Sequence, residues 1–435
     1  MLARNPALHV VARSTSETLK KRGLDAVSIA RELGVRYVVE GSVRVVGDIV
    51  RVSSDLIEGD TGIERWSRTF DQSRNDLIRL QDTLANTISS QLSMEVTATQ
   101  KKLRLGQATN PAAFDAYLRG WSLYRKASDG PDFVEVLSHF DEAARLDPGF
   151  AGAQASRAAT LGALGNIADS VEGAGRYYNE AEAAARRAIE LGPDLDEAHS
   201  VLAMILFDAR LQVQKAKPAY ERSIELGAGS AVIQARYAEY AALTRADDKA
   251  LKAIGTAIEL DPLNATILRS AALVHYAARR FDETIAMHRR ALELDPGFAP
   301  SHAWIGNALV QQGRAGEAQK SCAKAPGDLL GTPCLAIAAR RNGDIQAAQA
   351  AMAGLIGKFG DAALYQQAQV RAQWNEADAA MVLLAKARQV GDAGLTYLAT
   401  DPMLDPLRDR SDRHRIDMAT RSEEHTSELQ SRSVI

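Results

Sequence analysis

Two patterns of apolar and polar positions divide this chain into parts. Over residues 49–57 apolar and polar residues alternate, so that Val50, Val52 and Leu56 share one face and Arg51 lies on the other. Such alternation is typical of a strand with one buried and one solvated face. Farther along, short stretches ending in Leu-Asp-Pro or a variant of it recur at regular intervals. The chain is therefore predicted to join a small sheet to a helical repeat.

The elements of the first part follow from this alternation and from local stop signals. The pair Gly47-Asp48 separates two β-rich runs and predicts a tight hairpin turn. Asp25 can cap a helix over residues 26–33, which Gly34 would end. A further helix is expected at residues 77–96. We expect strands at residues 8–12, 36–46, 49–57 and 63–70.

The recurring stretches define the second part. They occupy residues 143–148, 188–193, 223–228, 257–262 and 291–296, and their leucines are separated by 45, 35, 34 and 34 residues. A step of 34 residues is the period of a two-helix repeat that must stack on a neighbour to bury its apolar face. The longer first step predicts an insertion near residues 166–175, and Pro218 is expected to kink its helix.

We count about seven repeat units in this second part.

Composition narrows the class of function. The chain has 435 residues, of which 46% are hydrophobic and 25% charged, as in ordinary globular proteins. A net charge of −3 argues against a nucleic-acid partner. No apolar stretch reaches the roughly 18 residues of a membrane span. Cys322 and Cys334 are too few for a disulfide framework or a zinc ligand set, so we expect two small buried side chains in helices.

The sequence offers no catalytic constellation. Its eight histidines form no close cluster with cysteines, and no glycine-rich phosphate loop opens a helix. We therefore predict no catalytic residues, no metal site and no cofactor. A repeat array of this kind is expected to act as a binding surface.

The first part resembles a known family. Residues 30–44 (ARELGVRYVVEGSVR), 56–62 (LIEGDTG) and 66–71 resemble the TolB-like amino-terminal domain of bacterial signalling proteins, and the match spans roughly residues 2–100. The resemblance implies an α+β domain with a small mixed sheet. Members of that family begin with a further strand and helix, which implies that this domain is incomplete and that an output domain lies outside the chain.

Residues 111–400 resemble tetratricopeptide (TPR) repeats, which implies an all-α superhelical solenoid. In that family, small residues at fixed positions let the two helices of a repeat approach closely, and the resemblance places them at Ala272, Ala291, Gly306, Ala318 and Ala325. By the family pattern its first helices line a groove for a protein or peptide, or for the output domain. Packing of the groove against the TolB-like domain is the alternative. The groove would be lined by Glu197, Ser200, Met204, Phe207, Arg236, Arg269, Leu273, Tyr276, Ala303, Asn307 and Gln311.

The last segments differ from the array. Residues 401–420 resemble the closing segment of TPR regions in cyclase-type proteins, and residues 421–435 resemble translated sequencing-adapter sequence and predict a disordered tail.

Our first hypothesis for the function of the chain is a non-catalytic interaction and sensory region. The alternatives are the regulatory part of a class III adenylate cyclase, which converts ATP to cyclic AMP, or the sensor of a winged-helix transcription regulator. We expect a cytoplasmic protein, or a periplasmic one if a membrane span lies upstream.

Overall fold

The computed structural model describes residues 8–73, 76–92, 108–125, 127, 130–168 and 171–408. The chain divides into two compact units, and the boundary between them falls inside the helical array. The first unit contains residues 1–202 and 226–229, and the second contains residues 203–225 and 230–435. Predictions that concern residues 1–7, 93–107 or 409–435, among them the tail at residues 421–435, fall outside the described residues.

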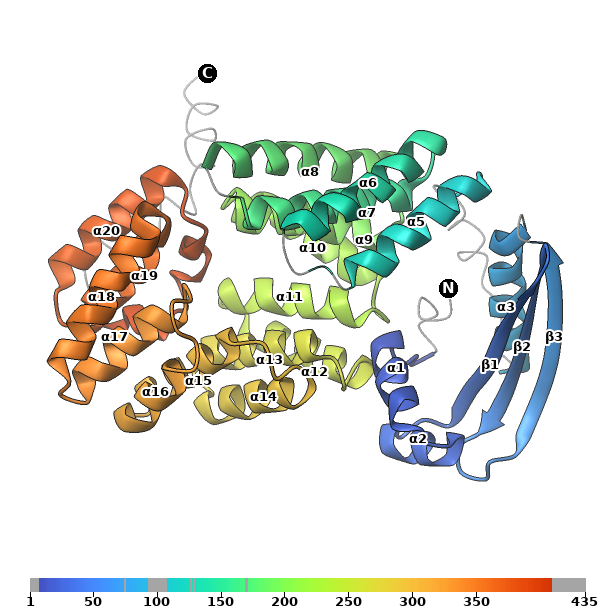
Figure 1. The fold of residues 1–435 in the computed structure, drawn as a ribbon, viewed down its shortest axis with the longest axis horizontal. Coiled ribbons are helices and arrows are strands. Elements are labelled where there is room, and N and C mark those ends of the chain that lie inside the picture. The colour runs from blue at the N-terminus through green and yellow to red at the C-terminus, as the bar shows by residue number, and fades with distance from the viewer. Residues whose placement is uncertain are drawn as a thin grey trace, which may run out of the picture. The chain divides into compact units, whose positions relative to one another are not determined.

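The first unit contains a three-stranded sheet in the order β1-β2-β3 (Figure 1), formed by Tyr37–Val46, Ile49–Glu58 and Glu64–Ser73. Both strand pairs are antiparallel, and Val52 pairs with Val43 on one side and with Phe70 on the other. The predicted hairpin is confirmed, with Gly47 at a φ of +62° that favours glycine. The described strands form no parallel pair, although a mixed sheet was expected.

One expected strand is absent from the described sheet. Residues 8–12 are irregular, and α1 (Arg13–Arg22) begins directly after them. A strand is stabilised by hydrogen bonds to a neighbouring strand, and β1, at the edge of the described sheet, pairs with β2 alone. An apolar run without such a partner does not form a strand, so this prediction was wrong.

Helices cover part of the sheet. α3 (Leu77–Gln91) packs on one face, where Val50, Phe70 and Leu80 are buried. On the same face β1 leaves Val43 65% exposed. α2 (Ala26–Leu33) has the predicted ends, because the Asp25 carboxylate accepts a 2.7 Å hydrogen bond from the Ser28 amide and Gly34 adopts a φ of +64°.

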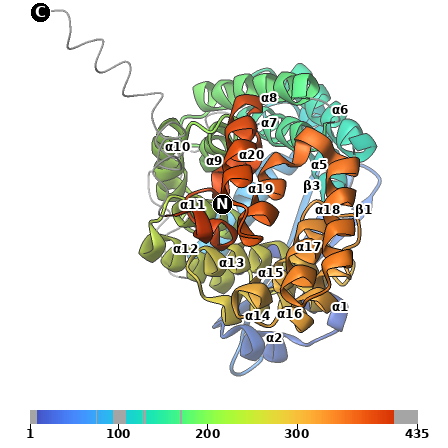
Figure 2. The same cartoon turned by 90° about the vertical axis from the view of Figure 1, so that its left-hand side faces the viewer.

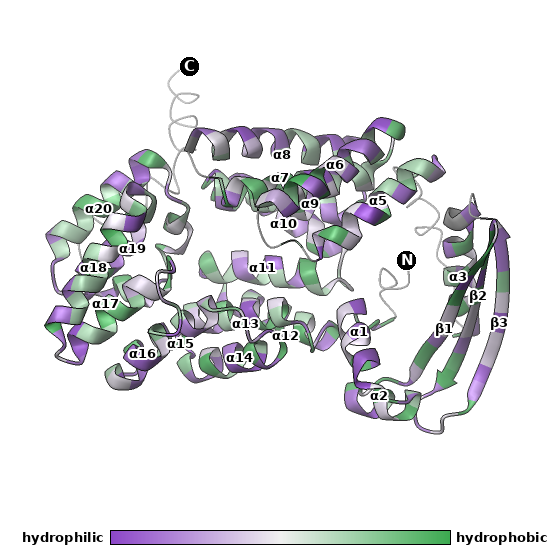
Figure 3. Ribbon diagram, viewed as in Figure 1, coloured by the Kyte–Doolittle hydropathy of each residue, from purple (hydrophilic) through white to green (hydrophobic). Residues whose placement is uncertain are grey.

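The helical array continues through both units as pairs of consecutive helices. In Figure 3 these helices carry hydrophobic and hydrophilic residues side by side, as expected when one stripe packs on a neighbour. In the first unit the pairs are α5 (Pro111–Tyr124) with α6 (Gly130–Leu146) and α7 (Ala151–Asn166) with α8 (Val171–Leu191). The long α8 takes up the insertion predicted before it. α9 (Asp196–Met204) crosses the unit boundary.

The second unit begins with the π-helix η3 (Ile205–Ala209) and α10 (Val213–Leu226), which runs without interruption through Pro218. The following pairs succeed one another in chain order (Figures 1 and 2). They are α11 (Ala231–Leu243) with α12 (Asp247–Leu260), α13 (Ala265–Ala277) with α14 (Phe281–Leu294), α15 (Pro300–Gln311) with α16 (Ala315–Cys322), α17 (Gly331–Arg341) with α18 (Ile345–Phe359), and α19 (Leu364–Gln373) with α20 (Ala377–Val390).

Small residues stand where neighbouring helices meet. Ala272, Ala291, Ala318 and Ala325 are each at most 1% exposed. A Cβ atom added at Gly306 would lie 2.4 and 2.5 Å from two sulfur atoms of the next helices. Such distances are too short for atoms in contact, so a side chain at this position would force α15 away from α16 and α17.

The two cysteines differ from the prediction in one respect. Both are buried, Cys322 at the end of α16 and Cys334 in α17, but they are joined by a disulfide. Their pairing depends on how α16 and α17 stack, because the two cysteines are 12 positions apart in the sequence. Cysteine number alone could not reveal this contact.

The close approach at Gly306 predicts a specific cost of added volume. Gly306→Ala should lower the free energy of unfolding by about 1–3 kcal/mol, because its methyl group overlaps both sulfur atoms. Gly255→Ala in α12 is the matched control, since a Cβ there meets no atom within 4 Å. It should raise the same free energy by about 0.5–1 kcal/mol. Urea unfolding followed by circular dichroism measures both. Equal stability of Gly306→Ala and the original chain would contradict the packing.

Candidate functional site

The predicted groove residues lie on the first helices of their pairs, except Phe207, which lies in η3. Glu197 and Ser200 belong to the first unit, and the other nine belong to the second. Five are buried: Ser200, Phe207, Tyr276, Ala303 and Asn307. The remaining six are half-buried: Glu197, Met204, Arg236, Arg269, Leu273 and Gln311. Their role in binding stays a prediction.

Several of these residues have partners within their own unit. Arg269 donates a 3.0 Å hydrogen bond to the Asp295 carboxylate and lies 4.1 Å from the centre of the Phe298 ring. Phe207 packs edge-on against Tyr240, with ring centroids 5.2 Å apart. The arginine therefore keeps a fixed position at the surface, while the phenylalanine belongs to the core.

The sequence placed a closing segment at residues 401–420, but it did not predict how that segment packs in the second unit. The closing segment, residues 393–407, contains the short helices η5 (Ala393–Tyr397) and η6 (Pro402–Leu407), which pack against α19, η3 and α15. Its leucines enter a core formed with α19 and α20. In this way the chain covers part of its own row of first helices.

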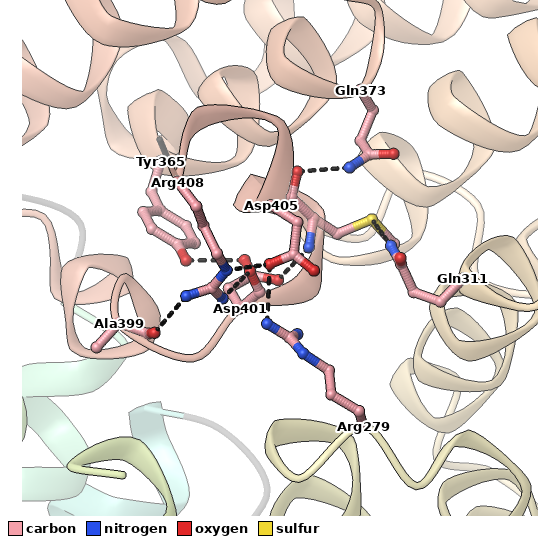
Figure 4. A network of polar contacts seen from close by, with 9 residues as sticks. Arg279, Gln311, Tyr365, Gln373, Ala399, Asp401, Asp405 and Arg408 are labelled. Carbon is pink, nitrogen blue, oxygen red and sulfur yellow. Dashed lines mark hydrogen bonds and ion pairs between the residues drawn. The ribbon is translucent and has the colours of Figure 1, made fainter. Parts of the chain in front are cut away.

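Buried hydrogen bonds fix the closing segment at Asp401 (Figure 4). Its carboxylate accepts hydrogen bonds from the Tyr365 hydroxyl at 2.8 Å, the Gln369 amide at 2.6 Å and the Met403 backbone amide at 2.9 Å. Burial raises the pKa of Asp401, although these three hydrogen bonds act in the opposite direction. Asp401 is thus an acidic group held in a poorly solvated place by neutral donors.

Two further contacts tie the segment to the first helices. Arg279, after α13, donates a 2.8 Å hydrogen bond to the Asp405 carboxylate, which also binds Arg408. Gln311, at the end of α15, donates to the Met403 sulfur at 3.2 Å (Figure 4). Because the Arg279–Asp405 pair is partly exposed, it contributes at most about 1 kcal/mol.

A cavity of about 170 Å³ remains between the closing segment and the helices of the second unit. Two of the predicted groove residues, Leu273 and Tyr276, line it. Its walls come from α11, α13, α15, the residue before α17, α19 and the closing segment. The lining residues are Leu243, Leu273, Tyr276, Ala277, Trp304, Leu330, Tyr365, Gln366, Gln369, Gly394, Tyr397, Thr400 and Asp401.

Polar atoms in the wall of this cavity lack partners. The Tyr276 hydroxyl and the Gln366 side-chain oxygen are buried and form no hydrogen bond with any residue that the structure describes. Buried polar atoms are usually paired, and leaving one unpaired costs about 1–3 kcal/mol. Burial also raises the pKa of Tyr276 far above its ordinary value. Both atoms belong to residues of the cavity wall and are themselves buried within it.

Two acidic residues near the cavity were also missed. Burial raises the pKa of Asp208 in η3 to about 7, with Glu239 adding to the rise and Arg236 opposing it. Burial likewise raises the pKa of Glu239 in α11. The charges of both carboxylates help to raise the pKa of Tyr397 in the closing segment. The burial that distinguishes them depends on tertiary packing, and no local sequence signal marks it.

The described residues contain no group of three or more His, Cys, Asp or Glu side chains that could hold a metal ion. Among the same residues, none of the helices combines the length and apolar character that a membrane span requires. The arrangement offers an enclosed apolar space with a few fixed polar groups, which is typical of binding sites.

Comparison with known proteins gives limited matches. No protein-family model matches the chain. The chain is 30% identical to "Putative adenylate cyclase 3" of Rhizobium meliloti (strain 1021) over 207 residues. This alignment covers 47% of the chain and 35% of that protein. The chain thus spans about a third of the length of the curated relative that it matches.

Solved structures with a similar fold were also found. Human IFIT1, crystallised as a dimer with m7Gppp-AAAA, aligns with a TM-score of 0.47 and 14% identity over 72% of this chain and 78% of that one. Yeast Tom70 aligns with a TM-score of 0.41 and 16% identity over 76% and 69%. A thermophilic TPR protein of Thermus thermophilus, TTC0263, gives 0.38 and 19% over 46% and 100%.

The predicted fold class is confirmed by the arrangement of the elements themselves. A small sheet with helices is followed by consecutive helix pairs of the TPR type.

The raised pKa of Asp208 predicts a pH-dependent stability. Between about pH 4 and pH 7 the folded state keeps the proton that the unfolded chain releases, so stability falls as the pH rises through this range. Asp208→Asn removes this titration. From pH 5 to pH 8 the variant should gain about 2 kcal/mol relative to the original chain. Urea unfolding at both pH values measures the change.

Asp248→Asn, at an exposed site in α12, is the control and should show no such gain. A constant difference between Asp208→Asn and the original chain at the two pH values would contradict the burial of this carboxyl group.

Proposed function

We propose that this chain is a non-catalytic interaction and regulatory region of a bacterial signalling protein. Its partner would be a protein or peptide that binds along the first helices of the second unit. The observation that carries the proposal is the row of half-buried side chains on α11, α13 and α15, namely Arg236, Arg269, Leu273 and Gln311. A surface built from repeated helices suits extended protein ligands.

The chemistry of this row supports a peptide partner. Arginine, amide and aliphatic groups lie together, and arginine and aromatic side chains dominate the energetics of protein interfaces. Arg269 is held by Asp295 and by the Phe298 ring, so less conformational entropy is lost when a partner carboxylate binds it.

The closing segment gives this surface a means of regulation. It occupies part of the row through Met403 and Asp405, whose partners are Gln311 and Arg279. A partner would bind beside the segment or displace it. Because the Arg279–Asp405 pair is partly exposed, displacing this end of the segment costs little, whereas the buried Asp401 contacts resist displacement.

A second candidate concerns the intact protein. The match to "Putative adenylate cyclase 3" of Rhizobium meliloti supports a parent protein that converts ATP to cyclic AMP, with this chain as its regulatory part. The TolB-like identity of the sheet domain, residues 1–100, belongs to the same proposal. So do the array at residues 111–400, the segment at residues 401–420 and the tail at residues 421–435.

The disulfide of the second unit bears on the cellular compartment of the protein. Cytoplasmic location was the expectation from the sequence. The Cys322–Cys334 disulfide is a bond more usual in oxidising compartments, and it supports the periplasmic alternative.

The proposal predicts which surface captures a partner. With the full chain as bait in a lysate of a bacterium that encodes it, Arg269→Gln should reduce capture of a specific partner at least threefold. Removing this charge deletes a fixed contact on α13. Quantitative mass spectrometry of the captured proteins gives the measurement.

Arg290→Gln is the matched control, because Arg290 lies exposed on α14, the second helix of the same pair. It should leave capture unchanged. Equal loss in both variants, or no protein above background, would contradict the proposed surface. Cyclic AMP formed from ATP by the purified chain would contradict its non-catalytic role.

A further inference from the structure

The cavity in the second unit has walls suited to a cation. Four aromatic side chains line it, and they come from four different elements: Tyr276, Trp304, Tyr365 and Tyr397. The Tyr276 and Trp304 ring centres are 5.2 Å apart with their planes at 79°, and Trp304 and Tyr397 are 6.4 Å apart at 45°. Differently oriented aromatic faces attract an organic cation through their quadrupoles.

The only charged side chain among the described residues that line the cavity is a carboxylate. Asp401 is the single carboxylate among the described lining residues, which include no lysine, arginine or histidine. Its hydrogen-bond donors are all uncharged, and among the described residues no ion pair includes it. The nearby Arg279 is paired with Asp405, but its positive charge also stabilises the Asp401 carboxylate. Burying a carboxylate is costly, and a bound cation would add to the stabilisation that Arg279 gives it.

Unpaired atoms and size define the ligand further. The Tyr276 hydroxyl and the Gln366 oxygen are buried acceptors without partners, and a ligand with a hydroxyl or N–H donor would reach them after a rotation of these two side chains. A cavity of about 150 Å³ is known to hold benzene. The 170 Å³ available here therefore fits a molecule of roughly six to ten non-hydrogen atoms.

We propose that this cavity binds a small free organic cation, an ammonium ion with apolar substituents and a hydrogen-bond donor. The aromatic rings surround the charged group, and Asp401 is its counterion. Because the closing segment forms one wall through Gly394, Tyr397, Thr400 and Asp401, the ligand also holds that segment in place. The proposal is independent of any protein partner.

Choline and its neutral isostere 3,3-dimethylbutan-1-ol provide the test. The two molecules have nearly the same shape and the same hydroxyl, but only choline is charged. Isothermal titration calorimetry of the full chain should show choline binding at least tenfold more tightly than the alcohol. Equal affinity of the two, or no binding of choline at millimolar concentration, would overturn the proposal.

Variants of the lining locate the site. Asp401→Asn should weaken choline binding at least tenfold, while Asp405→Asn, in the same segment but outside the cavity lining, should change it less than twofold. Trp304→Leu should also weaken choline binding at least fivefold. This second variant tests the same site if Asp401→Asn fails to fold. Equal effects of Asp401→Asn and Asp405→Asn in folded protein would overturn the assignment.

A third ligand tests whether the cavity prefers a free cation or the cationic side chain of a peptide. Nα-acetyl-trimethyllysine amide carries the same charged group on a peptide-like body that exceeds the cavity. It should bind more weakly than choline. Tighter binding of this compound than of choline would contradict a free ligand.

Discussion

The apolar stripe of a two-helix repeat cannot be buried within the repeat itself, and the rest of this structure depends on that constraint. Each pair in the second unit packs on the next, so that residues from α13 to α18 share one core. The approach is close only because small residues stand at the contacts. Gly306 leaves room for the sulfur atoms of Cys322 and Cys334, and alanines occupy the equivalent places in other helices.

The last pair of such an array has no further repeat to cover it. Here the closing segment takes that place, and its leucines complete the core of α19 and α20. The segment also carries aspartates, and burying one of them requires hydrogen-bond donors from α19. The cavity lies between this segment and the helices of the second unit.

Local determinants explain what the sequence could predict. The Gly47-Asp48 hairpin and the Asp25 cap depend on residues only a few positions apart, and both were found. Contacts between distant residues explain what it could not. Arg279 and Asp405 are 126 residues apart and Gln311 and Met403 are 92 apart, so no spacing rule links them. Likewise, a strand at residues 8–12 would have required a neighbour that only the fold could supply.

The central claim is that the closing segment is part of the folded second unit and not a loose end. Amide hydrogen exchange followed by mass spectrometry tests it directly at residues 394–408, with peptides from α19 as the internal reference. We expect these amides, including that of Met403, which donates to Asp401, to be protected nearly as strongly as those of α19. Exchange at the rate of an unstructured peptide would contradict the account.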